Sequence, residues 1–470
     1  MLARPTFGLL QPRTVGAELE MFLITPEGMP MPVNDAVRSA VDDSRIGLEM
    51  SRFNLELNLS PAALPGRPFT AFHTEARNAL AAITDAATRF GARPLLIGML
   101  PTLLPAHLTS SFLTAAHRYH ALDKALARAG HRPFTITVDG RHRDDRYVLR
   151  SDSVGVQGAV CSWQIHLVVP PHEYARTYNA AQLAIGPVLA AAGNSAIPFG
   201  RDLWCETRIP WYEQGMGDRT GPGPRQRSRV RFGRGWLHGS AQELFTATVR
   251  DHPPLLPFVF EQGPSDRPRP GTAPPLNELR LHQSTVYLWN RPVYDPADEG
   301  HLRIECRALP SGPTLTDMVA NAAALTGLIL HLSRTDAPDP AATLPFDDAR
   351  ANFYRAARWG LEANLRWPTE DGRAMNDHRA DDLLDKLLPR AADGLLAAHV
   401  DGREVRRWLA PLHQRLRTGG TGAAWQRRAL AASPGDARAT AALVRRYAQL
   451  SASDRPVHTW DPPEQGLRHD

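Results

Sequence analysis

Four short segments of the chain alternate apolar and polar residues, which is the pattern of a strand with one buried face. These segments are Ala17–Phe22, Phe53–Leu59, Trp163–Leu167 and Leu302–Ala308. Successive side chains of a strand point to opposite faces, so the polar residues of each segment share one face. The alternation therefore predicts four strands whose apolar sides pack in the core.

The polar faces of these segments carry acids, a histidine and arginines, whereas a solvated face is usually a mixture of Thr, Ser, Lys and Glu. The residues are Glu18 and Glu20; Asn54, Glu56 and Asn58; Gln164 and His166; Arg303, Glu305 and Arg307. Carboxylate oxygens are the ligands that magnesium requires, and arginine forks suit phosphate. One such segment alone is more simply a solvated face, but four together favour a magnesium site suited to ATP. Clustered carboxylates repel one another, and a bound cation would relieve that repulsion.

Some of these residues have two interpretations. A strand histidine is often a hydrogen-bonded structural residue, and the face that His166 shares with Gln164 leaves the metal-ligand role open. Arg307 can present a bidentate fork to phosphate or to a substrate carboxylate, while Arg303 can do the same or pair with Glu305. The neighbours of Glu49 define no strand register, so we interpret it as a loop acid outside the ligand set.

The composition bounds the class of protein. The 470 residues, 43% hydrophobic and 22% charged, are typical of a soluble globular protein with one large unit or two or three domains. We find no signal peptide and no run of about eighteen apolar residues, so we expect a cytoplasmic protein without a membrane partner. The three cysteines are far apart and have no disulfide or zinc spacing.

The charge of the chain also limits its partners. The net charge of +5 comes from basic residues spread along the whole sequence, which argues against nucleic acid. Only Lys124 and Lys386 are lysines, so phosphate contacts must come from arginine or backbone amides. The Gly-x-Gly patterns near Gly215 and Gly233 do not follow a strand and open a helix, which excludes Walker and Rossmann motifs. No nucleophile elbow is present.

The rest of the chain is predicted to be largely helical. Apolar spacing indicates helices over Phe69–Phe90, His117–Ala129, Pro171–Ala192 and Thr314–Leu332, and Val138–Val148 is a loop or a hairpin. Trp211–Gly239 is predicted to be a long loop rich in Gly, Pro and Arg, and its part 213–235 is either a basic lid over a nucleotide or disordered surface. Beyond about residue 340 the pattern is helical, so we divide the chain into a catalytic domain, 1–338, and a helical C-terminal region packed on it, 339–470.

The chain resembles the glutamate–cysteine ligase family, specifically its second type, the bacterial carboxylate–amine ligases. The resemblance runs from about Thr14 to about Leu332. Four motifs carry it: Val15–Glu20; Asn54–Asn58; Ser162–Leu167, followed by a helix ending at Gly193–Ala196; and Arg303–Arg307, followed by Gly312–Thr314 and Asp317. Each motif is short, and it is their order and spacing that are specific.

The resemblance implies an α+β fold, in which a glutamine synthetase-like curved, mostly antiparallel sheet forms a funnel with helices outside. It implies that Glu18, Glu20, Glu56, His166 and Glu305 hold magnesium and that Arg307, with Arg303, contacts the transferred phosphate. The implied reaction uses ATP to phosphorylate a substrate carboxylate, and an amine then attacks the acyl phosphate to form an amide. This reaction needs no protein nucleophile. The partners would be a small-molecule acid, such as glutamate or a related amino acid, and a small-molecule amine; a homo-oligomer is possible.

The chain also departs from the family pattern. Gln164 stands where small residues are common, and Leu281–Thr285 and Trp289–Pro292 differ from glutathione-synthesis enzymes, which puts cysteine in doubt as the amine. Arg291, His282 and Gln164 are therefore candidates for substrate binding. Two alternatives stay open: another phosphotransferase of the same fold, and a catalytically silent member that binds a nucleotide or a partner. The second is disfavoured because a decayed site would first lose its metal carboxylates.

Overall fold

The four predicted strands lie in one seven-stranded sheet. In the computed structural model the strand order is β10-β11-β7-β1-β3-β2, and β4 pairs with β1. The strands are β1 (Thr14–Ile24), β2 (Ile46–Leu48), β3 (Asn54–Ala63), β4 (Arg93–Leu95), β7 (Trp163–Val168), β10 (Asn290–Asp295) and β11 (His301–Cys306). The structure describes residues 7–8, 12–128, 133–141, 146–216, 228–256, 258–260, 273–297, 299–369, 372–431 and 436–461.

The register of this sheet brings the polar residues of neighbouring strands together. Every pairing described in it is antiparallel. Glu20 of β1 stands opposite Glu56 of β3, and Glu18 stands opposite Gln164 of β7. On the other side of β7, His166 stands opposite Glu305 of β11. The predicted polar faces therefore form one continuous polar surface.

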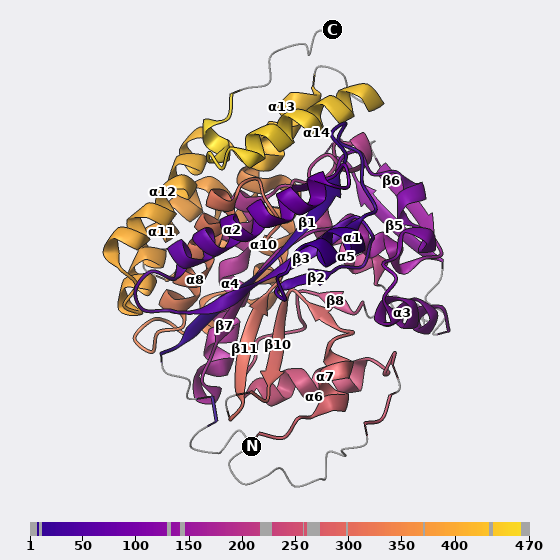
Figure 1. The fold of residues 1–470 in the computed structure, drawn as a ribbon. Helices are drawn as coiled ribbons and strands as arrows, with labels where there is room; N and C mark the ends of the chain where they lie inside the picture. The colour runs from indigo at the N-terminus through magenta and orange to yellow at the C-terminus, as the bar shows by residue number, and fades with distance from the viewer. Residues whose placement is uncertain are drawn as a thin grey trace.

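The apolar face of the sheet is covered by helices. Leu19 and Met21 of β1 are fully buried on this side, as the alternation predicts. The covering helices are α2 (Pro68–Thr88), α4 (Tyr174–Ala192) and α8 (Leu315–Leu332) (Figure 1). Thr314 caps α8 by accepting a hydrogen bond from the Asp317 amide at 3.0 Å, at the helix start predicted from the sequence.

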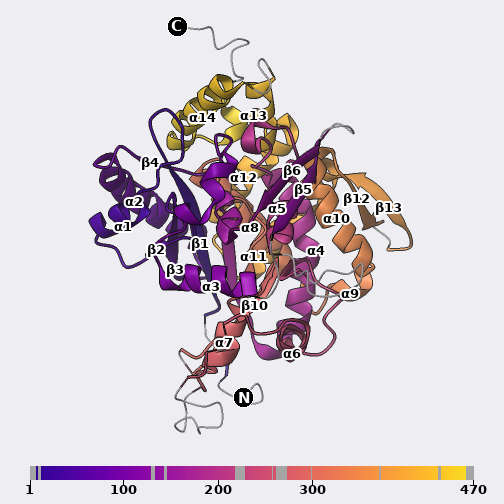
Figure 2. The same ribbon diagram turned by 90° about the vertical axis from the view of Figure 1, so that its right-hand side faces the viewer.

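Helix α8 is almost entirely buried. By length and composition it could cross a membrane, contrary to our expectation from the sequence, but 89% of it is buried inside the protein, as is usual for a core helix. The C-terminal helices form an outer layer, in which the first four pack on α4 or α8 and the last two pack on each other (Figures 1 and 2). It consists of α9 (Pro340–Thr343), α10 (Phe346–Trp359), α11 (Ala380–Ala397), α12 (Gly402–Thr418), α13 (Gly422–Leu430) and α14 (Ala437–Ala452), with a hairpin of β12 (Asn364–Pro368) and β13 (Met375–Arg379). The predicted helical C-terminal region is thus present, while the domain boundary at 338/339 stays a prediction.

Shorter elements lie along the edges of the sheet and around its polar face. They are α1 (Asn34–Ala40), α3 (His117–Arg128), the hairpin β5 (Phe134–Asp139) and β6 (Arg146–Ser151), α5 (Arg208–Gly215), β8 (Val230–Arg231), α6 (Ala241–Asp251), α7 (Asn277–Gln283) and β9 (Tyr287–Leu288). Val138–Val148 thus belongs to a hairpin. The prediction of one long loop over Trp211–Gly239 is wrong at both ends, because α5 extends into it and β8 pairs with β9. Its middle, 217–227, lies outside the described residues, so the lid hypothesis is not tested.

The expected fold class is confirmed: a mostly antiparallel sheet bears helices on its outer face. The helices α2, α4 and α8 do not cover the acidic face of the sheet, and the candidate site lies on this face.

Candidate active site

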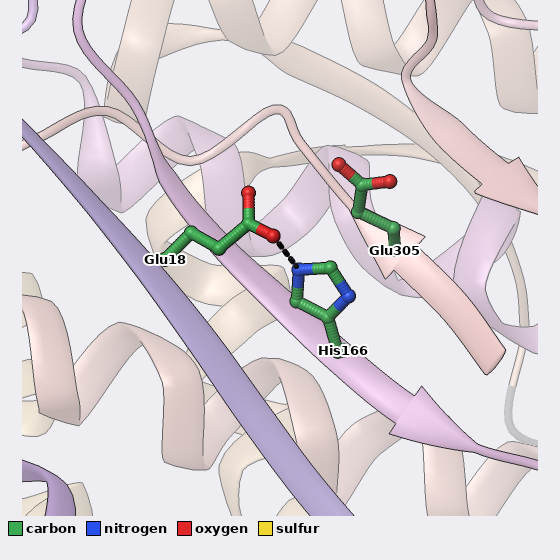
Figure 3. Close-up of side chains that lie close together, drawn as sticks. All are labelled: Glu18, His166 and Glu305. Atoms are coloured by element: carbon green, nitrogen blue, oxygen red, sulfur yellow. Dashed lines mark ion pairs between the residues drawn. The ribbon is translucent and has the colours of Figure 1, made fainter. Parts of the chain in front are cut away.

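The polar face of the sheet carries two groups of side chains that could each hold a metal ion. Glu18, His166 and Glu305 form the first group, and Glu20, Glu49 and Glu56 form the second. Within each group the potential ligand atoms all lie within 4.8 Å of one another. Figure 3 shows the first group, in which the Glu18 carboxylate points toward the His166 ring and Glu305 lies beside it.

Histidine 166 is held between an acid and an arginine. Its Nε2 lies 3.0 Å from Oε1 of Glu18. This buried nitrogen makes no aligned hydrogen bond within the described residues. On the other side of the ring, Nε of Arg303 donates to Nδ1 at 3.1 Å. Because Nδ1 accepts, the neutral ring carries its hydrogen on Nε2, and ligation through Nε2 would require Arg303 to leave Nδ1.

Glutamate 305 is neutralised by two arginines. Its side chain is fully buried, with Nε of Arg291 at 2.5 Å from Oε2 and Nη1 of Arg307 in contact with Oε1. Burial alone would raise the pKa of Glu305, but the two guanidinium groups lower it far below its usual range. Burial acts likewise on Glu18, where the neighbouring His166 outweighs it and lowers the pKa. The first group is therefore largely balanced in charge.

The second group has no such balance. Glu20 accepts hydrogen bonds from the Ser162 amide at 2.6 Å and from Nε2 of Gln164 at 2.9 Å, and Asn58 donates to Glu56 at 2.8 Å. Burial and the charge of Glu49 raise the pKa of Glu20 to about 7. Burial and the neighbouring carboxylates raise the pKa of Glu56 well above its usual value, and burial also raises that of Glu49.

These donor sets fit magnesium. Three half-buried carboxylates that face one another favour their charged forms only if a cation shares the site, and hard carboxylate oxygens are the ligands magnesium prefers. Nε2 of His166 could join them only in the tautomer that carries its hydrogen on Nδ1, where Arg303 now donates. The residues that would hold the ions are therefore those of the two groups.

Arginine 307 connects the two groups. Its Nη1 contacts Oε1 of both Gln164 and Glu305, and its guanidinium carbon lies 5.6 Å from the ring centre of Tyr287. A cavity of about 50 Å³ borders it, lined by residues that include Glu20, Glu49, Gln157, Tyr212, Trp289 and Arg307. Both amide atoms of Gln157 are buried there and make no hydrogen bond within the described residues.

Most of the predicted site residues meet on this face, and two positions differ from expectation. Arg303 pairs with Asp295 at 2.8 Å and not with Glu305. His282 lies on α7, where Nε2 is 3.4 Å from the Thr248 carbonyl, and burial lowers its pKa. The structure does not bring His282 to either carboxylate group.

The sequence analysis excluded Glu49, and the structure places it in the second group. Glu49 follows Gly47 by two residues, and Gly47 stands opposite Glu56. Continuing the alternation of this short strand would have put Glu49 on the acidic face, but three residues are too few for a recognisable pattern. Gln157 and Tyr212 carried no signal at all, because they come from a short 3₁₀-helix and from α5, outside the four strands.

Comparison with known proteins agrees with this geometry. The family model of glutamate-cysteine ligase family 2 matches residues 14–446. The chain belongs to this family. A member of glutamate-cysteine ligase family 2 is an ATP-dependent carbon–nitrogen ligase of the carboxylate–amine type, which confirms the predicted class of enzyme. No curated protein sequence is significantly similar to the chain.

Solved structures related to this family member are distant in sequence. A glutamate–cysteine ligase from Francisella tularensis, in complex with AMP, is 12% identical, with 96% of this chain and 90% of that chain covered and a TM-score of 0.49. A bifunctional glutathione synthetase from Pasteurella multocida is 11% identical, with 93% and 52% covered and a TM-score of 0.49. The ligase PafA in complex with the ubiquitin-like protein Pup is 10% identical, with 87% and 64% covered and a TM-score of 0.35.

Proposed function

We propose that this ligase activates a substrate carboxylate with ATP, as an acyl phosphate, and joins it to an amine with release of ADP and phosphate. The observation that carries the proposal is the pair of carboxylate groups on one sheet face with Arg307 between them. Magnesium bound there would offset the charge of the phosphates and orient the γ-phosphate. No protein nucleophile is needed for this chemistry.

The residues of the chain have separable tasks in this proposal. Glu18, His166 and Glu305 hold one cation, and Glu20, Glu49 and Glu56 hold another. Arg307, with Arg303 close by, stabilises the charge that develops on the transferred phosphoryl group, since an arginine fork matches phosphate geometry.

Residues beside the two groups position the site and contact the substrate in this proposal. Arg291 keeps Glu305 in place, and Nε2 of Gln164 does the same for Glu20, so both position the site from its edge. The unpartnered amide of Gln157 offers one donor and one acceptor to a polar substrate group in the cavity. We infer that the acid is glutamate or a related amino acid, one of whose polar groups pairs with this amide.

The direct test is ADP release from ATP and magnesium with pooled amino acids and amines, followed by mass spectrometry of the products. A product whose mass equals acid plus amine minus water would establish the ligase and name both substrates. A stable phosphorylated acid would instead identify a kinase of the same fold. ATP binding without ADP release in any mixture would indicate a silent binding protein.

A further inference from the structure

A second cavity, of about 530 Å³, lies on the opposite side of the sheet edge from the carboxylates. Consecutive residues of β9 point to opposite sides of the strand. Tyr287 faces the Arg307 guanidinium, and the next residue, Leu288, lines the cavity. Tyr178 of α4, which covers the helical face of the sheet, forms another wall, and its hydroxyl donates to the Asn290 carbonyl at 3.0 Å. The cavity is therefore separate from the candidate active site.

Three arginines in the cavity wall converge on one buried acid. Asp251, whose side chain is 1% exposed, is 3.0 Å from Nη2 of Arg231, 3.0 Å from Nη1 of Arg234 and 3.1 Å from Nε of Arg250. One carboxylate neutralises only one of the three guanidinium groups. Burial and the neighbouring Arg234 accordingly lower the pKa of Arg231.

The acid that lines the cavity itself, Glu243, is already engaged. Glu243 accepts hydrogen bonds from the amides of Gly239, at 2.5 Å, and Ser240, at 3.2 Å, as part of the capping box of α6. Even with both acids ionised, three arginines against two carboxylates leave the cavity a net positive charge. Nε of Arg231 is buried and makes no hydrogen bond within the described residues, so a donor remains available.

The remainder of the wall is mixed, with Trp236, Leu237 and Leu244 beside these arginines. Planar guanidinium forks bind phosphate oxygens in bidentate fashion, and a volume of several hundred Å³ holds a small organic molecule. We propose that the cavity formed by Arg231, Arg234 and Arg250 binds the phosphate groups of a phosphorylated small molecule, at a site distinct from the carboxylate groups. The proposal does not depend on the ligase mechanism.

The test is calorimetric titration of the full chain with pyrophosphate in EDTA, because without a cation the carboxylate groups repel this anion. We expect binding that Arg234→Gln and Arg250→Gln each weaken about tenfold, the loss of one charged hydrogen bond. Thr246→Glu adds a negative charge to the exposed wall and leaves the arginines unchanged. We expect this variant to weaken pyrophosphate binding as well. Titration with ADP separates the sources: tighter binding than pyrophosphate identifies an organic phosphate, and weaker binding identifies the inorganic anion.

Arg379→Gln is the matched control, because Arg379 is an exposed arginine that pairs with Asp381 and does not line the cavity. It should leave pyrophosphate binding unchanged, and melting curves of all variants verify that they fold. Equal affinity in the wild type and the three cavity variants would overturn the proposal. So would loss of binding in Arg307→Gln with the cavity variants unaffected, since pyrophosphate would then occupy the active site. Neither result depends on whether a ligase product is found.

Discussion

Single carboxylates of the candidate site differ in how their charge is balanced. Glu305 has two arginine partners, whereas Glu56 faces two other carboxylates at short range. Removing one charge should therefore affect stability in opposite ways at the two positions, although both side chains are proposed to hold magnesium.

We predict that Glu56→Gln and Glu305→Gln each lower turnover by on the order of 10²-fold or more, because each removes a metal ligand while keeping the size of the side chain. In magnesium-free urea unfolding, Glu305→Gln should destabilise the protein by about 3 kcal/mol, since it leaves Arg291 and Arg307 buried without their acid. Glu56→Gln should leave stability unchanged or raise it, since it removes a repulsion.

Glu27→Gln is the matched control for both variants, because Glu27 is exposed in the turn after β1. It should behave as the wild type in both assays. Wild-type turnover in Glu56→Gln and Glu305→Gln would refute the assignment of the metal ligands.

The pKa of Glu20, about 7, predicts a pH dependence in the second group. Its folded pKa lies above its unfolded value of 4.5, so the folded protein retains the proton longer. Without magnesium, stability should fall as the pH rises from about 4.5 to about 7 and then level off.

Magnesium must displace this proton, so its affinity should weaken about tenfold as the pH drops from about 7 to about 6, for one proton released. The rise in melting temperature on adding magnesium, measured across this range, checks the prediction. An affinity that does not change with pH would contradict it.

At the scale of elements, the contact between α8 and α11 depends on two glycines. A Cβ atom on Gly327 would collide with the Ala391 carbonyl, and one on Gly394 would collide with the Gly327 carbonyl. The two helix backbones thus approach closely, and α8 in turn covers the sheet that carries the acids.

We predict that Gly327→Ala destabilises the protein by about 1–3 kcal/mol, the usual range for overpacking, measured by urea unfolding. Gly402→Ala, at the first turn of α12, is the control, because a Cβ atom there would meet its nearest neighbour only at 3.6 Å. That variant should be neutral or slightly more stable, since alanine favours helix over glycine. Equal effects of the two substitutions would show that helix propensity, and not the close approach, governs stability.

At the scale of the whole molecule, the C-terminal helices are tied to the catalytic region by buried polar contacts. Nη2 of Arg415 on α12 lies 2.7 Å from Asp317 on α8, and Nη1 donates to Asn321 at 2.7 Å. The Tyr447 hydroxyl on α14 donates to the Leu96 carbonyl, next to β4, at 2.9 Å. The site and the C-terminal helices should therefore unfold together.

We predict that Arg415→Met lowers the free energy of unfolding by about 3–5 kcal/mol, because Asp317 would remain as a buried, uncompensated charge. Arg417→Met on the same helix is exposed and should change it by less than about 0.5 kcal/mol. A two-step transition in Arg415→Met, with the sheet intact after the first step, would show instead that the C-terminal helices unfold independently.

The sequence alone determined which residues of each strand share a face, because side-chain alternation is local and has a period of two. For that reason Glu18 and Glu20, Gln164 and His166, and Glu305 and Arg307 could be assigned to one polar surface. Helix starts such as Thr314 with Asp317 were equally local. The order and spacing of the short motifs also indicated the family.

Only the tertiary structure decided which acids meet, because strand order and register depend on residues far apart in the chain. It divided the acids into two groups, added Glu49 from a strand too short to recognise, and paired Arg303 with Asp295. It also directed Arg231 and Arg234, which the sequence placed in a loop that was either a lid or disordered surface, onto the buried Asp251. Charge pairing of this kind follows from burial and distance, and neither quantity is local to the sequence.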